Sequence, residues 1–505
     1  MSAGLHRILH SGHQDERLNG PALPWYNKPT AKTGRYTTQW RRVDFDTTPA
    51  YGTKATASIP VAGELLTRIY LVANLPSFGP GLAQAQAQAQ ALGQTFVGPS
   101  LGYTNSLGHA LIREASLTIG NTAFDVLTGR FLETLDEYET PLEQVPLVNS
   151  MIKRADNGFY VGLYGSAGAD PTTVAVPLPF WCVKGDLKTV LPLDALNASR
   201  VQVAVDFRSL AELYVSDAVL GTVVGDEIAT AENETQTTTQ LFSGSCVDLT
   251  RTATTSLTFY TKDGGGTYYT LGGINFGDLR LGDTYLMVEY VYVDKLEAAS
   301  WRNSHIEYPI TTHYSFPIVQ TAGSRVVVID LPYNNPVRFL YFSLQRVEAA
   351  AANMHFHAAR DLRRPVIDQS GGYWWPDASG LVYDRPGFLV PGYSGLESEP
   401  VSSIELTYEG KHVKLRTTNP ALYRSLLPSL EKTKTPWVNR YYYCIPLSSG
   451  GYGEVNWNKI TTKTLTLTLA PDVAGIIPSY NVYCHVDACN VFSVYGGTAS
   501  LLFDA

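Results

Sequence analysis

The chain contains no long apolar segment and few cysteines. No run of apolar residues reaches the roughly 18 that a membrane-spanning helix needs. No charged stretch followed by an apolar one opens the sequence as a secretory signal would. The five cysteines are odd in number and scattered. These features predict a protein that folds in a reducing cytosol without disulfide bonds.

Charged residues are also scarce. They make up 17% of the sequence, and the net charge is −8, which argues against a protein that coats nucleic acid along its whole length. The chain has instead 31 tyrosines and 43 glycines, a composition that suits pleated, half-buried strands joined by turns. Because 505 residues exceed one comfortable core, we expect two or more β-rich domains that need neither metal nor disulfide for stability.

Short runs of strand-like composition recur along the chain. The clearest is 201–207, in which Val201, Val203, Val205 and Phe207 share one face. Further strands are expected at 55–60, 65–76, 111–127 (broken at 120–121), 174–181, 257–261, 285–293, 325–329, 337–344, 404–408, 441–447, 464–469 and 480–494. Many short strands separated by turns, with few helices, predict an all-β chain built from β-sandwiches.

One helix is expected within this pattern. Apolar residues recur at three- and four-residue spacing from Leu127 to Leu142, and Thr128 is suited to cap the helix. The opposite face carries acids that we expect to be solvated, namely Asp136, Glu137 and Glu139. The helix therefore reads as amphipathic, with one face on a core.

A polar stretch at 220–245, rich in Thr, Gln and Glu, separates two series of strands. Such a composition is typical of a linker between domains. We therefore expect an N-terminal arm at 1–45, a first sandwich at 46–225, a linker at 226–250 and a second sandwich at 251–505.

Two segments stand apart from the strands. The arm is basic, with seven Lys or Arg residues up to Arg42 against Asp15 and Glu16. It is either a solvated terminus or a cationic arm lying on an anionic layer of lipid or nucleic acid. The repeat Ala83–Gln90 has helix propensity but no apolar stripe, so we expect a surface excursion rather than a core element.

Several residues are candidates for a metal-binding, catalytic or ligand-binding site. Cys484, His485 and Cys489 lie at a spacing that zinc tolerates, but no second ligand pair follows nearby, so buried thiols are expected. His355 and His357 would share a face of a strand, although a surface loop is the better reading.

Glycines and aromatics give no better candidate. The glycines at 264–266 lack the Lys-Ser/Thr of a phosphate loop. The aromatics at 374–375 and 441–443 could stack on sugars, but such residues more often pack in cores or interfaces. The sequence therefore predicts no catalytic, cofactor-binding or metal-binding residue.

Residues Val288–Tyr308 pass from an aromatic and aliphatic run into a short charged segment, then to Trp301 and an acidic-aromatic end. They resemble the signature that opens the second half of the major capsid proteins of nucleocytoplasmic large DNA viruses. Other segments resemble that family in the same order, at 63–71, 107–120, 177–181, 191–196, 335–341, 437–447 and 453–460. The resemblance covers roughly 40–470. It weakens at 298–300, where Ala, Ala and Ser stand in place of arginines that are common in the family.

The resemblance implies two tandem eight-stranded antiparallel jelly rolls, with long loops and few short helices. It implies a non-enzymatic subunit of an icosahedral capsid, located in the virion and folded and assembled in the host cytoplasm, with no cofactor. Three chains would form a homotrimeric, pseudo-hexameric capsomer. Further implied partners are neighbouring capsomers, minor capsid or penton proteins and, through the basic arm, an internal membrane, but no specific nucleic acid. The alternatives are a β-sandwich receptor- or carbohydrate-binding spike or minor capsid protein, and a β-sandwich glycosidase.

Overall fold

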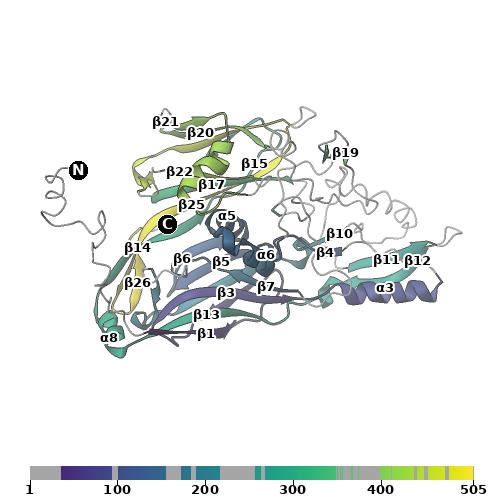
Figure 1. The fold of residues 1–505 in the computed structure, drawn as a ribbon, viewed down its shortest axis with the longest axis horizontal. Helices are drawn as coiled ribbons and strands as arrows, with labels where there is room; N and C mark the ends of the chain where they lie inside the picture. The colour runs from purple at the N-terminus through teal and green to yellow at the C-terminus, as the bar shows by residue number, and fades with distance from the viewer. Residues whose placement is uncertain are drawn as a thin grey trace, which may run out of the picture.

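The computed structural model describes most of the chain (Figure 1). The described residues are 36–93, 101–154, 172–183, 189–216, 256–262, 268–347, 350, 353, 355–356, 366–367, 373–374, 399–410, 412–436, 441–447, 453–471 and 477–503. The expected linker at 226–250 and the first 35 residues of the expected arm lie outside this set. Within it, no helix has the length and apolar character needed to cross a membrane.

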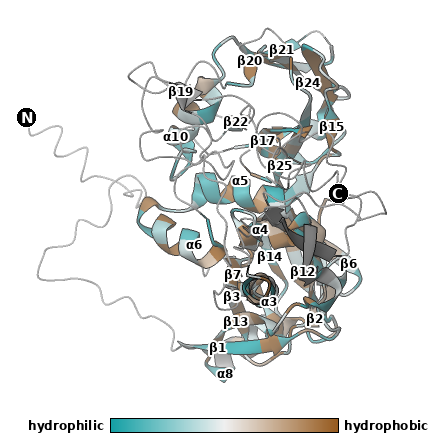
Figure 2. Ribbon diagram, turned by 90° about the vertical axis from the view of Figure 1, so that its right-hand side faces the viewer, coloured by the Kyte–Doolittle hydropathy of each residue, from teal (hydrophilic) through white to brown (hydrophobic). Residues whose placement is uncertain are grey.

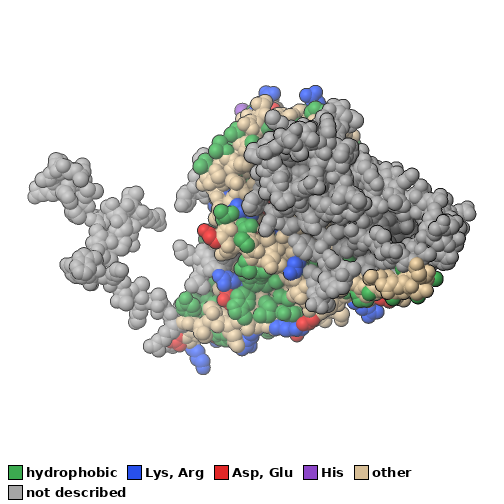
Figure 3. Space-filling view, turned by 45° about the vertical axis from the view of Figure 1, so that its right-hand side comes forward, with side chains coloured by type: hydrophobic (Ala, Val, Ile, Leu, Met, Phe, Trp, Pro, Cys, Tyr) green, Lys and Arg blue, Asp and Glu red, His purple; other side chains and the backbone are tan. Residues whose placement is uncertain are grey.

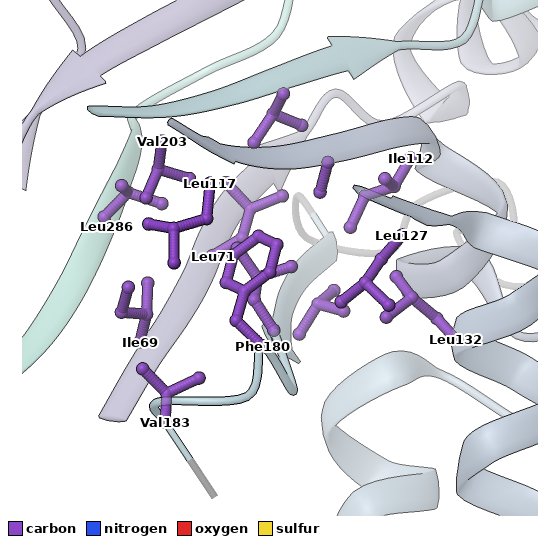
Figure 4. Close-up of a cluster of buried hydrophobic side chains, with 14 of the residues drawn as sticks. Ile69, Leu71, Ile112, Leu117, Leu127, Leu132, Phe180, Val183, Val203 and Leu286 are labelled. Carbon is purple, nitrogen blue, oxygen red and sulfur yellow. The ribbon is translucent and has the colours of Figure 1, made fainter. Parts of the chain in front are cut away.

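The first sandwich occupies the lower half of Figure 1. One sheet contains β1 (Tyr36–Asp44), β13 (Thr284–Val293), β3 (Leu65–Leu75) and β7 (Thr172–Pro177) in that order, with β8 (Leu191–Pro192) also paired to β3. The facing sheet has the order β2 (Lys54–Ser58), β9 (Val201–Phe207), β5 (Ile112–Ile119) and β6 (Thr122–Thr128). Alternate residues point inward, so Leu71, Leu117 and Val203 meet in the core between the sheets (Figure 4).

The second sandwich lies above the first. One sheet has the order β14 (Ile306–Ser315), β25 (Tyr480–Tyr495), β17 (Pro336–Arg346) and β22 (Tyr442–Pro446), with β15 (Val319–Gln320), β23 (Val455–Asn456) and β26 (Thr498–Leu501) at its margins. The other has the order β16 (Val326–Asp330), β24 (Lys463–Leu469), β20 (Val401–Tyr408) and β21 (His412–Thr417). Its core contains the fully buried Trp457 and a stack of Phe342 on Tyr443, with ring centroids 4.5 Å apart. The expected all-β, two-sandwich fold is confirmed.

The strand β13 corrects the predicted domain division. The sequence placed the expected strand at 285–293 in the second sandwich. In the structure it pairs with both β1 and β3, so that Met287 lies opposite Arg42 on one side and Tyr70 on the other. Leu286 joins the core of the first sandwich (Figure 4). Strand composition predicts a strand but not its partner, and here the partner lies more than 200 residues away.

The strand β1 corrects the predicted arm in the same way. Residues 36–44 form the edge of the first sandwich, and Val43 is buried in its core. Most other side chains of β1 are exposed. A strand whose side chains are mostly exposed and polar carries little apolar periodicity, and this explains why the sequence pattern missed it.

The helices are short and several lie between the sandwiches. They are α4 (Leu107–Leu111), α5 (Gly129–Glu139), α6 (Val145–Ile152), α8 (Lys295–Asn303) and α10 (Leu427–Glu431), the last preceded by a π-helical turn at Leu422–Leu426. The predicted cap of α5 is present, because Phe131 N–H donates to Thr128 Oγ1 at 3.3 Å. Figures 1 and 2 show α5 lying where the two sandwiches meet.

A projection of one helix and one hairpin extends from the first sandwich, at the right of Figure 1. The helix is α3 (Gly79–Ala91), which contains the Ala/Gln repeat and packs along β12 (Tyr268–Asn275). β12 pairs with β11 (Ser256–Lys262), and nearby β4 (Leu101–Tyr103) pairs with β10 (Tyr214–Ser216). Ala89 of the repeat is fully buried. The repeat is thus a surface excursion, as expected, but a helical one.

Replacing Gly129 by alanine should lower the free energy of unfolding by about 3 kcal/mol, because overpacking against atoms that cannot move is costly. A Cβ at this position would overlap the backbone oxygens of Ile112 and His109, where α5 begins against α4 and β5. The matched control is Gly410→Ala. Gly410 has φ +65° but nothing within 4 Å of the added Cβ, so only the cost of a left-handed residue, about 1–2 kcal/mol, is expected. Urea unfolding midpoints compare the two, and equal losses would contradict the steric argument.

Candidate functional site: the seam between the two sandwiches

We use the term seam for the surface along which β6 and α5 of the first sandwich meet β14, β17, β22 and β25 of the second. Phe124 on β6 lies edge-on to Phe492 on β25, with ring centroids 5.7 Å apart. Trp181 contacts the same Phe492 ring at 4.7 Å. The Tyr308 hydroxyl on β14 donates to Val190 O at 2.8 Å. One continuous apolar cluster therefore contains residues of both sandwiches, which fixes how the two are placed.

The centre of the seam is Phe131, which is fully buried. Its ring stacks on His485 of β25 with centroids 4.6 Å apart. It also packs edge-on against His313 of β14 at 5.3 Å and Tyr341 of β17 at 5.6 Å. Burial, together with the nearby Arg130 and His313, lowers the pKa of His485 to about 3, so its imidazole is neutral at pH 7. A single side chain of α5 thus touches three strands of the other sandwich.

A first group of buried charges lies on the side of α5 that faces α4 and α6. Glu133 is fully buried and accepts from His109 Nδ1 at 2.7 Å and from Arg154 Nη2 at 2.5 Å. Arg154 also pairs with Asp136 and lies 3.9 Å from Glu137. Burial alone would raise the pKa of Asp136, but Arg154 above all, then His109 and Lys434, hold it below its usual value. One arginine therefore compensates three carboxylates.

A second group of charges crosses the seam. Asp125 of β6 accepts from His313 Nδ1 at 2.9 Å and from the His313 backbone N–H at 3.1 Å. Lys432, from the second sandwich, lies 3.1 Å from Glu139 of α5 and 3.8 Å from Asp487. Burial lowers the pKa of Lys432, but Glu139 and Asp487 outweigh it, and the net pKa is raised. The hydrogen bonds of His313 to Asp125 and the ion pair of Lys432 with Glu139 thus join the two sandwiches.

The acidic face of α5 was expected to be solvated, and this prediction is wrong. Glu137 is fully buried, Asp136 is largely buried, and the carboxylates pair with cations of other elements. One sequence signal could have shown this. Glu133 and Glu137 are four residues apart on a helix whose only basic residue is Arg130, and like charges at this spacing destabilise a helix unless cations elsewhere compensate them. His109, Arg154, His313 and Lys432 gave no such signal, because their roles depend on contacts between distant segments.

The charges of the seam serve geometry rather than chemistry. Burying an ion pair costs about as much desolvation free energy as the pair returns, so such pairs contribute little net stability. A misplaced pair, however, leaves an unpaired buried charge and costs several kcal/mol. Any other arrangement of the two sandwiches would leave buried charges of the seam unpaired and would therefore have a higher free energy.

The cysteine and histidine cluster expected near the C-terminus is buried as two separate parts. Cys484 lies in the core of the second sandwich, whereas His485 points the other way, into the seam. Burial raises the pKa of the Cys484 thiol to about 12. Cys489 is only partly buried. In the part of the chain that is described, no group of three or more His, Cys, Asp or Glu side chains is arranged to hold a metal.

The structure describes some of the remaining candidate residues but not others. His355 Nε2 donates a hydrogen bond to the backbone oxygen of Glu212 at 2.7 Å, while His357 lies outside the described residues. The side chains at 441–443 are all buried, which confirms the prediction that these tyrosines pack in a core. Buried rings cannot stack on a sugar. Trp375 and the glycines at 264–266 lie outside the described residues.

Exposed apolar side chains occur at several places on the described part of the molecule, and two of these places lie on different sandwiches. A hollow of about 660 Å³ lies between α5, α6 and the strands β3 and β7, and Leu147, Val148 and Met151 line it. Leu147 of this lining is 63% exposed, and Leu142, five residues before it in the chain, is 64% exposed. The second surface is β16 of the other sandwich, whose Val326 and Val328 point outward. Figure 3 shows hydrophobic side chains gathered in the lower half of one face, above a rim of Lys and Arg.

Comparisons with known proteins agree with this architecture. Residues 25–244 match the family model described as "Major capsid protein N-terminus". "Probable capsid protein 4" of Acanthamoeba polyphaga mimivirus is 24% identical over 217 residues, 42% of this chain and 39% of that protein. "Capsid protein 1" of the same virus is 22% identical over 353 residues, 68% of this chain and 48% of that protein. The matches thus span less than half the length of these relatives.

The fold is also similar to a solved capsid structure. VP54 of PBCV-1, fitted into a reconstruction of the virophage Sputnik, superposes with a TM-score of 0.63 at 15% identity. The match covers 95% of this chain and 100% of that one. At this identity the likeness concerns the fold, which is the double jelly roll. The matched N-terminal region, the curated relatives and the fold are thus all similar to the double jelly-roll major capsid proteins of large DNA viruses.

Proposed function

We propose that the chain is the main structural subunit of an icosahedral virus shell, and that three copies form each capsomer. The observation that carries this proposal is the seam. Two similar sandwiches held rigidly side by side give one chain the outline of a third of a hexagon, and three chains then approximate a six-sided tile. A subunit of this kind needs shape and stiffness rather than a reactive site.

Closed threefold symmetry makes a specific demand on the surface. In a ring of three, each contact is heterologous, so one surface of a chain meets a different surface of its neighbour. Two exposed apolar surfaces lie on different sandwiches, the one with Leu142 and Leu147 on the first and β16 on the second. We assign the hollow beside α6 to the contact with the next copy, since exposed apolar surface of this kind marks interaction sites.

Light scattering after size exclusion tests this directly. The wild-type chain should elute as a trimer with a mass of about three times 55.3 kDa. The double variant Leu142→Asp, Leu147→Asp should be monomeric with an unchanged circular dichroism spectrum, because both side chains are exposed and a buried charge at an interface is costly. The control Val413→Asp, at a half-exposed position on β21, should remain trimeric.

Two results would contradict the proposal. A trimeric double variant would remove the hollow from the subunit contact. A monomeric wild-type chain that binds glycans would favour the alternative of a receptor- or carbohydrate-binding spike. The same proposal includes contacts with neighbouring capsomers, with minor capsid or penton proteins and, through the basic arm, with an internal membrane. It also includes assembly in the host cytoplasm and a linker at 226–250.

A further inference from the structure

A small pocket lies within the seam, at the N-terminal end of α5. Its volume is about 210 Å³, and its lining includes Arg130, Arg208, Glu212, Gln345, His355, Phe356 and Tyr483. Arg130 and Arg208 come from the first sandwich, whereas Gln345 and Tyr483 lie on β17 and β25 of the second. The segment with His355 is tied to the first sandwich, since Asn353 Nδ2 donates to Ala211 O at 2.6 Å. Residues of both sandwiches therefore line the pocket.

Arg130 is buried in this pocket with only neutral partners. The residue is 6% exposed. Its Nη2 donates to Gln345 Oε1 at 2.6 Å, and its guanidinium lies over the rings of Tyr483 at 4.4 Å and Phe356 at 5.3 Å. In the described ranges no carboxylate pairs with it. A buried guanidinium without a counter-charge is costly, and amide and ring contacts offset only part of that cost.

The second arginine adds to this excess of positive charge. Arg208 lies 3.9 Å from Glu212, and its Nε is buried without a hydrogen bond. Glu212 is shared with Arg113 at 3.6 Å. Burial lowers the pKa of Arg208, Glu212 raises it, and Arg130 lowers it again, with a net lowering. The two arginines of the pocket thus repel each other. Among the described residues that line the pocket, Glu212 is the only carboxylate.

The start of α5 acts in the same direction. Arg130 is the second residue of this 11-residue helix, and the first turn carries no acidic residue. The N-terminal end of a helix carries a partial positive charge that favours anions. The N-terminal end of α5 and the side chains of Arg130 and Arg208 therefore all favour an anionic ligand.

We propose that this pocket binds a small phosphate-type oxyanion that joins the two sandwiches. Two guanidiniums and an amide suit the several acceptor oxygens and the charge of phosphate. The volume corresponds to about seven water molecules at their share of liquid volume. It holds one phosphate group with bound water but lies below the range of pockets that enclose a nucleotide-sized ligand. A bound anion would stabilise the assembled chain, because it binds only when both sandwiches are in place.

Calorimetric titration of the wild-type protein with inorganic phosphate at constant ionic strength tests this. We expect saturable binding of one phosphate per chain and a rise of a few degrees in the thermal midpoint. Arg208→Gln, at a partly exposed site that should tolerate the change, is expected to weaken binding at least tenfold. Arg130→Gln should do the same. The control Arg416→Gln, an exposed arginine paired only with Glu405, should bind as the wild type does.

Three outcomes would overturn the proposal. They are the absence of saturable phosphate binding to the wild type, wild-type affinity in Arg208→Gln, and acetate binding as tightly as phosphate. Adenosine diphosphate should bind no tighter than phosphate, and tighter binding would show a larger nucleotide site instead. If Arg130→Gln does not fold, Arg208→Gln alone decides the result.

Discussion

Replacing Arg154 by methionine is expected to lower the free energy of unfolding by about 3–5 kcal/mol, the usual cost of removing one partner of a buried ion pair. The arginine is almost fully buried and is the shared partner of Glu133, Asp136 and Glu137. Methionine fills a similar volume, so the loss measures the uncompensated carboxylates rather than a cavity. Urea unfolding at fixed protein concentration, followed by the fluorescence of the eight tryptophans, gives the difference.

The loss should depend on pH with a definite sign. The pKa of Asp136 is lower in the folded protein than its usual value, so its contribution is complete above about pH 4 and is lost as the pH falls through the folded pKa. Without Arg154 the buried carboxylates should have raised pKa values and bind protons at higher pH. The difference between variant and wild type should therefore be largest near pH 7 and shrink toward pH 4.

An exposed arginine supplies the control. Arg416 pairs with Glu405 at 3.3 Å on the surface of β21, and Arg416→Met should change stability by no more than about 0.5 kcal/mol. If Arg154→Met were equally mild, the charged group beside α5 would not be a tightly packed, water-free cluster. A loss that stays constant from pH 7 to pH 4 would instead assign the effect to packing.

Replacing Phe131 by alanine is expected to cost about 3–5 kcal/mol, the range for emptying a buried phenylalanine site. The ring is fully buried and touches His313, Tyr341 and His485, all on strands of the second sandwich. These strands are held by their own sheet, so they cannot close the cavity fully. Phe131→Leu should cost less than about 1.5 kcal/mol, because most of the volume is kept.

A second readout separates a seam defect from general instability. Water entering the cavity of Phe131→Ala should raise the pKa of His485 from about 3 toward its usual value, and imidazole NMR signals would report this. The control Phe503→Ala, at a partly exposed position near the C-terminus, should change neither stability by more than about 0.5 kcal/mol nor the histidine signals. An unchanged His485 in Phe131→Ala would contradict the packing described for the seam.

Much of the secondary structure could be predicted from the sequence. The expected strand at 201–207 coincides with β9, the one at 65–76 with β3, and the cap at Thr128 is present. These elements bury one face, and the period of their apolar residues reports that face directly. The predicted pair of β-sandwiches follows from the same alternation.

The candidate site was harder to predict. The sequence predicted no catalytic or metal-binding group of residues. It did not predict the charged and aromatic seam, on which the placement of the two sandwiches depends. Glu137 reads as a surface residue on a helical wheel, and Lys432 as one charge in a polar loop. Their burial follows from the contact between two domains, which local periodicity does not contain.

By itself the sequence determined that this chain is a double β-sandwich without a long apolar segment, because alternation and turn composition act over a few residues. The tertiary structure alone decided which strands pair, as for β13 between β1 and β3. It also decided which charges are buried, as for Glu133 with His109 and Arg154. Pairing and burial are properties of segments brought together from far apart, and the free energy that selects them comes from contacts that no single segment can make.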